Sequence, residues 1–250
     1  MTLKEIRILH ATKIETIYGR TFAGKIWIAL KPMIQLVFMG FVFGKIITIN
    51  QENHTAFIMY GFLLLNFITA SLSSASGTIS ENIFITSRFN VSKNFFSVVN
   101  IYYNLYICFI SFIPCALLVA IFTNLPIHLN MIFAPFYLIY IVTTMFLVCA
   151  SIAIIYPYFQ DIKFLIEVTS MVSLWVTPIF YPMSQMPGWM FKLSYFNPFF
   201  ILIAPFVRLM HEGLLPTMSM HISMLGLFVV SLLIYIITQK KLSRNVIYYC

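Results

Sequence analysis

The chain has 250 residues, of which 61% are hydrophobic and 9% are charged, and its net charge is +8. A soluble domain carries roughly 25% charged residues and could not bury so much apolar surface, so this composition excludes a soluble protein. It indicates a polytopic membrane protein, in which the excess of Lys and Arg fixes orientation across the bilayer rather than binding nucleic acid. The four cysteines form no C-x-x-C pair, which argues against a zinc site or a disulfide framework.

Residues 1–31 are too charged to enter a bilayer and predict a cytoplasmic interfacial helix on the inner membrane surface. They contain no isolated apolar block of the kind that marks a cleavable signal peptide. Within them, Gly19 to Lys25 has the spacing G-x-x-x-x-G-K of a nucleotide-binding P-loop. A P-loop needs Ser or Thr after the lysine to ligate Mg²⁺, and it follows a strand. Here Ile26 follows the lysine and a charged, helix-like segment comes before it, so the spacing does not predict ATP binding.

Six apolar runs approach the roughly 20 residues that a membrane-spanning helix needs. They cover residues 33–49, 56–76, 97–122, 131–156, 164–181 and 220–237. A weaker run over 195–209 is broken by Asn197-Pro198 and by Pro205. We therefore expect an all-α polytopic membrane protein with one transmembrane domain over residues 32–250, six transmembrane helices and both termini in the cytoplasm.

The basic residues are distributed as the positive-inside rule requires if both termini are cytoplasmic. Twelve of them would then lie inside: Lys4, Arg7, Lys13, Arg20, Lys25, Lys31, Arg88, Lys93, Lys163, Lys240, Lys241 and Arg244. Three would lie outside: Lys45, Lys192 and Arg208. A seventh span would carry the C-terminal cluster outside, so residues 182–213 are predicted to form a re-entrant hairpin on the outer side. Such backbone is tolerated only where it is buried in protein or lines a cavity, which makes the hairpin a functional candidate.

This topology leaves two cytoplasmic connections, ENIFITSRFNVSKN at residues 81–94 and YFQDIK at 158–163. The first is long enough to hold a short helix. Glu167, one turn into the fifth run, is expected to be an interfacial or partner-facing carboxylate rather than part of a proton relay. No set of His, Cys, Ser or carboxylate residues has the spacing of a catalytic or metal site, so neither is predicted.

Two further patterns are compatible with either packing or function. The second run ends in TASLSSASGT, where Ala70 and Ser74, and also Ser71 and Ala75, have small-x-x-x-small spacing. Such faces let helices approach closely, either within one subunit or at a dimer seam or channel wall. Aromatic residues crowd around the hairpin, where they form an interfacial belt or a stacking surface for sugar rings.

Four motifs occur in order along nearly the whole chain. Ala23-Gly24-Lys25-Ile26-Trp27 is followed by Pro32, and TPIFYPMSQMP at residues 177–187 is followed by Asn197-Pro198 and Arg208. The two cytoplasmic connections lie between them. This order resembles the membrane subunit of polysaccharide-exporting ABC transporters, the type-two exporter permeases that move O-antigen, capsule or teichoic acid chains. In that family the second connection usually reads Phe-Arg-Asp-Ile or Phe-Arg-Asp-Leu, and Gln160 stands here in place of the Arg.

The resemblance implies a division of labour between subunits. Two copies of this chain would form a pore in the bacterial cytoplasmic membrane, and each copy would dock one ATP-binding-cassette ATPase subunit. ATP and Mg²⁺ would bind to that partner, so this chain would carry no cofactor and would not itself be an enzyme. The cargo would be a lipid-linked polysaccharide among membrane lipids, and no nucleic acid would be involved.

The resemblance also assigns residues to three roles. ATPase coupling falls to Glu81, Asn82, Ile85, Arg88, Phe89, Phe159, Gln160 and Asp161. The entrance from the interfacial helix into the first span contains Arg20, Gly24, Trp27 and Pro32. The channel or gate for the sugar chain would contain Trp175, Pro178, Tyr181, Pro182, Trp189, Tyr195, Asn197 and Pro198.

Other functions remain open. A permease that exports a small molecule or drug would have similar loops and a similar partner. A membrane enzyme of glycan or lipid assembly would need ionisable residues gathered on one face, and the seven acidic residues are scattered. An ion-coupled transporter would have paired broken helices in two related halves, whereas only one broken segment is visible.

Overall fold

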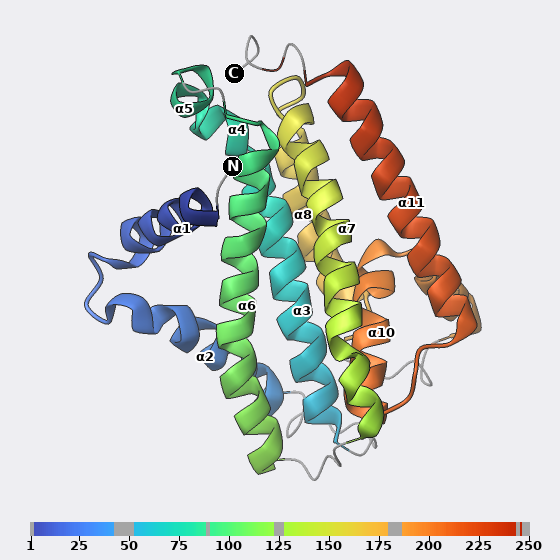
Figure 1. Cartoon of the computed structure of the whole chain (residues 1–250). Helices are drawn as coiled ribbons and strands as arrows, with labels where there is room; N and C mark the ends of the chain where they lie inside the picture. Colours follow the sequence, from blue (N-terminus) through green and yellow to red (C-terminus); the bar gives the residue numbers. More distant parts are fainter. Residues whose placement is uncertain are drawn as a thin grey trace.

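The computed structural model describes residues 3–42, 53–88, 91–122, 128–179, 187–243 and 246, and every regular element within them is helical (Figure 1). Four helices are long and apolar enough to cross a membrane. They are α3 (His54–Ala75), α6 (Asn94–Phe122), α7 (Ala134–Ile155) and α11 (Met218–Lys241). The chain is therefore a helical, multi-pass membrane protein, as its composition predicts.

Two of the six predicted spans correspond to shorter helices. The described parts of α2 (Trp27–Phe41) and α8 (Ile162–Val176) have 15 residues each, or about 22 Å at 1.5 Å per residue. The pair α9 (Gly188–Ser194) and α10 (Pro198–Glu212) is bent by 96° and forms either a broken span or a re-entrant loop. By length and composition, the described residues thus contain four or five candidate membrane spans. The count of six spans and the side of the termini stay predictions.

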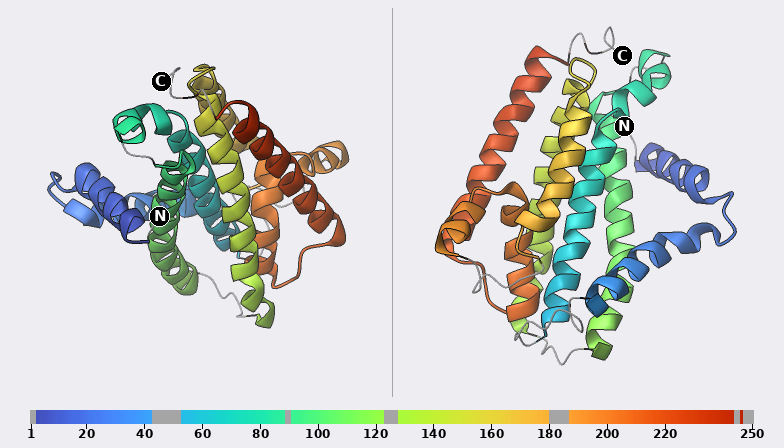
Figure 2. Two further views of the ribbon diagram at one scale, coloured as in Figure 1. Left: turned by 45° about the horizontal axis from the view of Figure 1, so that its top comes forward. Right: turned by 180° about the vertical axis from the view of Figure 1, so that it is seen from behind.

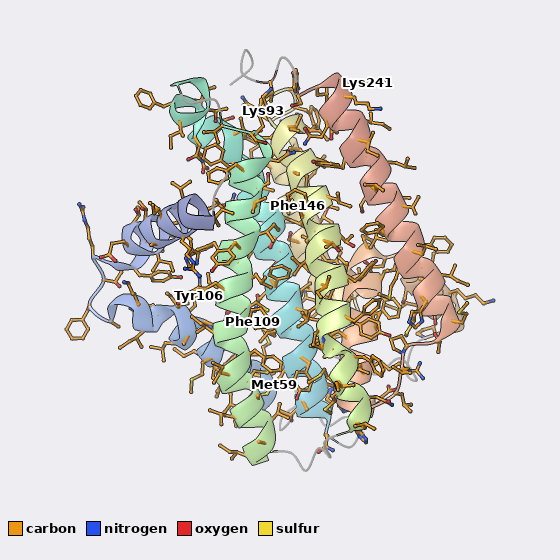
Figure 3. All side chains as sticks on the ribbon, viewed as in Figure 1. Met59, Lys93, Tyr106, Phe109, Phe146 and Lys241 are labelled. Atoms are coloured by element: carbon orange, nitrogen blue, oxygen red, sulfur yellow. The ribbon has the colours of Figure 1, made fainter. Side chains whose placement is uncertain are left out.

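Helix α3 is the centre of the bundle. It packs against α2, α6, α7, α8 and α10, and the view from behind in Figure 2 shows it between α8 and α6. It is apolar around most of its circumference, which is typical of a helix buried on most of its faces. Gly61 lets the segment that follows α8 approach α3, because a Cβ there would lie 2.9 Å from Ile179 Cγ2. By contrast, α6 and α11 expose apolar side chains such as Phe109 to the surroundings, which suits contact with lipid (Figure 3).

The bend before α10 is built from Asn197 and Pro198. Asn197 Oδ1 accepts a hydrogen bond from the backbone N–H of Phe199 at 3.0 Å, and its Nδ2 donates to Thr177 Oγ1 at 3.2 Å. Pro198 occupies the first helical position, where a missing N–H costs nothing. The helix that follows is buried from Phe199 to Val207. The hairpin region thus holds its helix inside the protein, as backbone at membrane depth requires.

The N-terminal segment breaks earlier than the predicted boundary at residue 31. Helix α1 (Leu3–Tyr18) ends in a turn, the 3₁₀-helix η1 (Gly24–Ile26) follows, and α2 begins at Trp27. Gly24 has a φ of +52°, and a salt bridge of 3.4 Å joins Lys25 to Glu15 across the turn. Residues 19–25 therefore connect two helices, which is not the strand–loop–helix arrangement of a P-loop. In Figure 1, α1 runs across α6 rather than along it.

One end of the bundle gathers several connections and basic residues. Helices α4 (Thr78–Glu81) and α5 (Ile83–Arg88), the α7–α8 turn and the end of α11 all lie there, and Figure 3 labels Lys93 and Lys241 at this end. Tyr158 Oη in the turn donates to the carbonyl of Leu242 at 2.7 Å, which holds the turn against the end of α11. The two connections predicted to face the cytoplasm are thus on the same end.

Gly213 gives a test of packing at the opposite end. Its φ is +66°, and a Cβ there would overlap the imidazole of His128. We expect Gly213→Ala to destabilise the protein by roughly 3 kcal/mol, because strained backbone and overpacking act together. Gly226→Ala is the control, since a Cβ at Gly226 meets nothing within 4 Å and Ala favours a helix by about 1 kcal/mol. Thermal unfolding in detergent should show a clear loss for the first variant and none for the second.

Candidate functional site

A cavity of about 470 Å³ lies among helices α2, α3, α6 and α8, with the last turn of α1 at its edge. Its wall contains apolar side chains such as Leu63 and Phe67, but polar side chains come from every helix that surrounds it. They are Lys31, Gln35, Asn66, Thr69, Ser73, Asn104, Ser111, Glu167 and Ser170. Polar groups within membrane helices are costly unless they are satisfied, so they gather where function requires them. This cavity is the candidate site.

Two asparagines set the polar character of the cavity wall. Asn104 is buried and donates through Nδ2 to Ser74 Oγ at 3.0 Å, which joins α6 to α3. Asn66 on α3 is half-buried and also lines the cavity. Each amide has a carbonyl oxygen and an NH₂ group, so the pair can exchange hydrogen bonds with hydroxyl groups of a bound molecule.

Two opposite charges stand on facing helices of the cavity. Lys31 comes from α2 and Glu167 from α8, and both side chains are exposed. The sequence predicted Glu167 to be an interfacial or partner-facing carboxylate, and the structure places it on the cavity wall. Its neighbour on the wall, Ser170, lies on the next turn of the same helix.

The residues predicted for the entrance divide between the cavity and the turn before it. Trp27 and Pro32 line the cavity, and Trp27 exposes 39% of its surface. Arg20 and Gly24 lie in the exposed turn between α1 and α2 and do not line it. Tyr18, the last residue of α1, joins Trp27 at the edge of the cavity. The predicted transition from the first helix to the second is therefore next to the cavity.

The small residues at the end of α3 separate into two faces. Ser71 and Ala75 are buried, so they pack within the subunit. Ala70 is exposed and lines the cavity, whereas Ser74 accepts the Asn104 hydrogen bond. Packing within the subunit thus accounts for Ser71, Ser74 and Ala75, and a dimer seam or channel wall at this spacing stays a prediction.

The residues predicted for ATPase coupling lie at the end that carries α4 and α5. Glu81 is exposed at the end of α4, and Asn82 Nδ2 donates to the carbonyl of Thr78 at 2.8 Å. Ile85 packs against a buried cluster formed by Phe95, Phe96 and Val99 of α6. Arg88 ends α5, and Phe89 lies outside the described residues.

The second connection presents three exposed side chains at this same end. Phe159 exposes 49% of its surface, and Gln160 and Asp161 beside it are exposed as well. Behind them, a small buried cluster of Ile79, Ala153 and Ile154 packs α4 against the end of α7. A partner that binds this end of the bundle would therefore contact both connections, residues 81–94 and 158–163.

A profile of the ABC-2 type transporter family matches residues 4–211. The chain belongs to the ABC-2 type transporter family. The match covers α1 to α10 and so includes the cavity and both connections that are predicted to face the cytoplasm. A search of curated proteins found no match. Members of this family form the membrane component of ABC transporters, which generally dimerise and work with ATPase subunits.

The described residues of the predicted channel or gate for the sugar chain do not line the cavity of this ABC-2 chain. Trp175 and Trp189 expose 64% and 67% of their surface, and Tyr195 is half-buried against Phe200. Pro178 is buried, whereas Asn197 and Pro198 shape the start of α10. Tyr181 and Pro182 lie outside the described residues. The gating role of this set stays a prediction.

Reasoning from sequence missed the polar lining of the permease cavity. Gln35, Asn66 and Asn104 were not singled out, although each interrupts an apolar run. That interruption was the available signal, because an amide inside a membrane helix is rare unless it has a partner or a task. Spacing alone could not show that these three residues line the same cavity.

Proposed function

We propose that the chain is the transmembrane subunit of an ABC exporter that moves a lipid-linked polysaccharide across the bacterial cytoplasmic membrane. A separate ATPase subunit hydrolyses ATP, bound with Mg²⁺, and this chain converts its motion into transport. The observation that carries the proposal is the 470 Å³ cavity, whose wall combines amides and hydroxyls with aromatic and aliphatic side chains. A lipid-linked glycan has the same two characters, a polyhydroxyl chain and an apolar tail.

The cavity and its surroundings suit the two parts of this cargo. Asn66 and Asn104 would exchange hydrogen bonds with sugar hydroxyls, and Trp27 would stack on the C–H face of a sugar ring. The outer face of α2 beyond Pro32 exposes Val37 and Phe38, which a lipid tail can contact without leaving the bilayer. The cargo could thus enter sideways, with its sugars in the cavity and its tail in lipid.

A second copy of the chain completes the proposed pore. Helices α2 and α8, which border the cavity, expose rows of apolar side chains that the subunit itself does not cover. On α8 these include Val168, Met171 and Val172. Dimerisation is general in the ABC-2 family, and a partner copy over these helices would enclose the cavity between two subunits. Each subunit would then dock one ATPase through α4, α5 and the α7–α8 turn.

A permease for a small molecule or drug is the second candidate. The cavity volume of about 470 Å³ supports it, since pockets for drug-sized ligands span roughly 300–1,000 Å³. A polysaccharide would pass through such a cavity a few sugars at a time, whereas a small molecule would occupy it whole.

Disruption of the gene distinguishes these two functions. The neighbouring genes stay intact, and glycan is blotted separately from the cell surface and from the cytoplasmic membrane fraction. We expect lipid-linked polymer to disappear from the surface and to accumulate at the membrane, and a plasmid copy of the gene should reverse both changes. Unchanged surface glycan in a strain without a redundant exporter would contradict the polysaccharide proposal and leave the small-molecule permease.

A further inference from the structure

A second cavity, of about 540 Å³, lies between α1, the end of α3, α4 and α6. It adjoins the first cavity at Ser73, which lines both. One lysine and one carboxylate line it, Lys13 from α1 and Glu81 from α4. The salt bridges among the described residues do not include this pair, so the two charges face the cavity without neutralising each other in direct contact.

Lys13 is held by neutral groups. Its Nζ donates to Asn100 Oδ1 and lies 4.6 Å from the centre of the Tyr103 ring. Burial lowers the pKa of Lys13, and the nearby charge of Glu81 opposes this shift. A lysine has three N–H donors, and Asn100 accepts one of them. The ammonium therefore has donors left for an anionic group in the cavity.

Asn100 fixes the position of this lysine. Its Nδ2 donates to the carbonyl of Ser74 at 3.0 Å and to Thr78 Oγ1 at 2.6 Å, while its Oδ1 accepts from Lys13. One side chain on α6 thus joins α1, the end of α3 and α4. The ammonium and the start of α4 are set in place by the same amide.

Three hydroxyl groups on the cavity wall present acceptors rather than donors. Thr12 Oγ1 donates to the carbonyl of Ile8 at 3.0 Å, and Thr16 Oγ1 donates to that of Thr12 at 2.9 Å. Ser76 Oγ donates to the carbonyl of Ser73 at 2.8 Å. Each hydroxyl has one proton, so these three have only lone pairs to offer a ligand. Together with the Glu81 carboxylate, they favour a ligand that carries N–H donors.

We propose that this cavity binds the headgroup of a zwitterionic aminophospholipid, with the phosphate at Lys13 and the primary ammonium at Glu81. The anionic phosphate of such a headgroup complements the Lys13 ammonium, and its cationic ammonium complements the Glu81 carboxylate. A headgroup would also lie at the right level, because α1 crosses the first turns of α6, near the end of the bundle that holds α4. The ligand is a resident lipid that bridges α1 and α4, distinct from the exported cargo.

The test uses the full chain, purified in detergent and exchanged with three phospholipids. Native mass spectrometry measures how much phosphatidylethanolamine, phosphatidylcholine and phosphatidylglycerol it retains. Phosphatidylethanolamine should be retained about tenfold more than either of the others, since a charged hydrogen bond is worth about 1.5 kcal/mol or more. Phosphatidylcholine has a cation without N–H donors, and phosphatidylglycerol has no cation.

Matched variants separate the two contacts. Lys13→Gln should lose retention of phosphatidylethanolamine, and Lys13→Arg, which keeps the charge, should preserve it. Glu81→Gln should lower phosphatidylethanolamine to the level of phosphatidylglycerol without changing the latter. Lys25→Gln is the control, because Lys25 is exposed in the α1–α2 turn and does not line this cavity.

Two outcomes would overturn the proposal. Equal retention of the three phospholipids by the natural chain would show that the cavity does not recognise an ammonium, whatever the variants do. Displacement of phosphatidylethanolamine by an excess of a prenyl diphosphate would assign the site to a cargo lipid instead. Both measurements use the unmodified chain, so neither depends on whether a variant folds.

Discussion

Replacement of Ala70 by tryptophan is expected to reduce export to the level of cells without the gene. Ala70 lies on the exposed face of α3 and lines the 470 Å³ cavity, so an indole at this position would fill space that the cargo must cross. The opposite face of α3 would remain packed, because Ser71 and Ala75 are the buried residues of this turn. The variant should therefore fold and reach the membrane while transport stops. Surface glycan per cell, divided by the amount of the chain in membranes, is the measurement.

Ala120→Trp is the matched control for this experiment. Ala120 is exposed on α6 and lines neither the 470 Å³ nor the 540 Å³ cavity, so the same added bulk would point elsewhere. Export by this variant should equal that of the natural chain. Normal export by the Ala70 variant would remove this cavity from the transport path. The residues around the hairpin, which the resemblance assigned to the sugar channel, would then be the next candidates for the transport path.

The long spans could be predicted from sequence because each is a long, predominantly apolar run. The predicted starts at residues 56, 97 and 220 lie within three residues of the observed starts of α3, α6 and α11. The first span was harder, because α2 begins at Trp27 among charged residues and contains Pro32. Average apolarity over a window cannot locate a helix that starts at the membrane surface and then enters the bilayer.

The hairpin shows what composition can and cannot establish. Asn197-Pro198 predicted a break in the chain, and the structure has one there, since the amide caps α10 and the proline opens it. The sequence could not show that Asn197 also donates to Thr177, 20 residues away. A polar pair next to a proline has the same pattern whether it shapes a helix or contacts a ligand.

The cavities lay beyond prediction for a different reason. The 470 Å³ cavity needs one face from each of four helices, and the contact between Lys13 and Asn100 joins residues 87 positions apart. Such contacts depend on how each helix is rotated about its own axis, because this rotation decides which side chains face inward. The amides in the apolar runs marked the right residues but not their common location.

Replacement of Phe159 by aspartate is expected to detach the ATPase subunit. Phe159 exposes 49% of its surface in the α7–α8 turn, and Gln160 and Asp161 beside it are exposed too. If Phe159 is one of the few residues that dominate the interface with the ATPase, its replacement should cost about 2 kcal/mol, which corresponds to a loss of affinity of roughly 30-fold. Co-purification of the ATPase with a tagged chain should therefore fall sharply, and export should fall with it.

Two variants at the same turn separate lost contact from lost folding. Phe159→Leu keeps an apolar side chain and should retain much of the binding. Gln160→Arg places at this position the residue usual in the polysaccharide exporters that the chain resembles, and it should leave binding unchanged or strengthen it. The turn itself is held by the Tyr158 hydrogen bond to Leu242, which none of these changes touches. If the aspartate variant bound the ATPase as well as the natural chain does, coupling would have to pass through α4 and α5 alone. Ile85, packed on Phe95 and Phe96, would then be the next residue to replace.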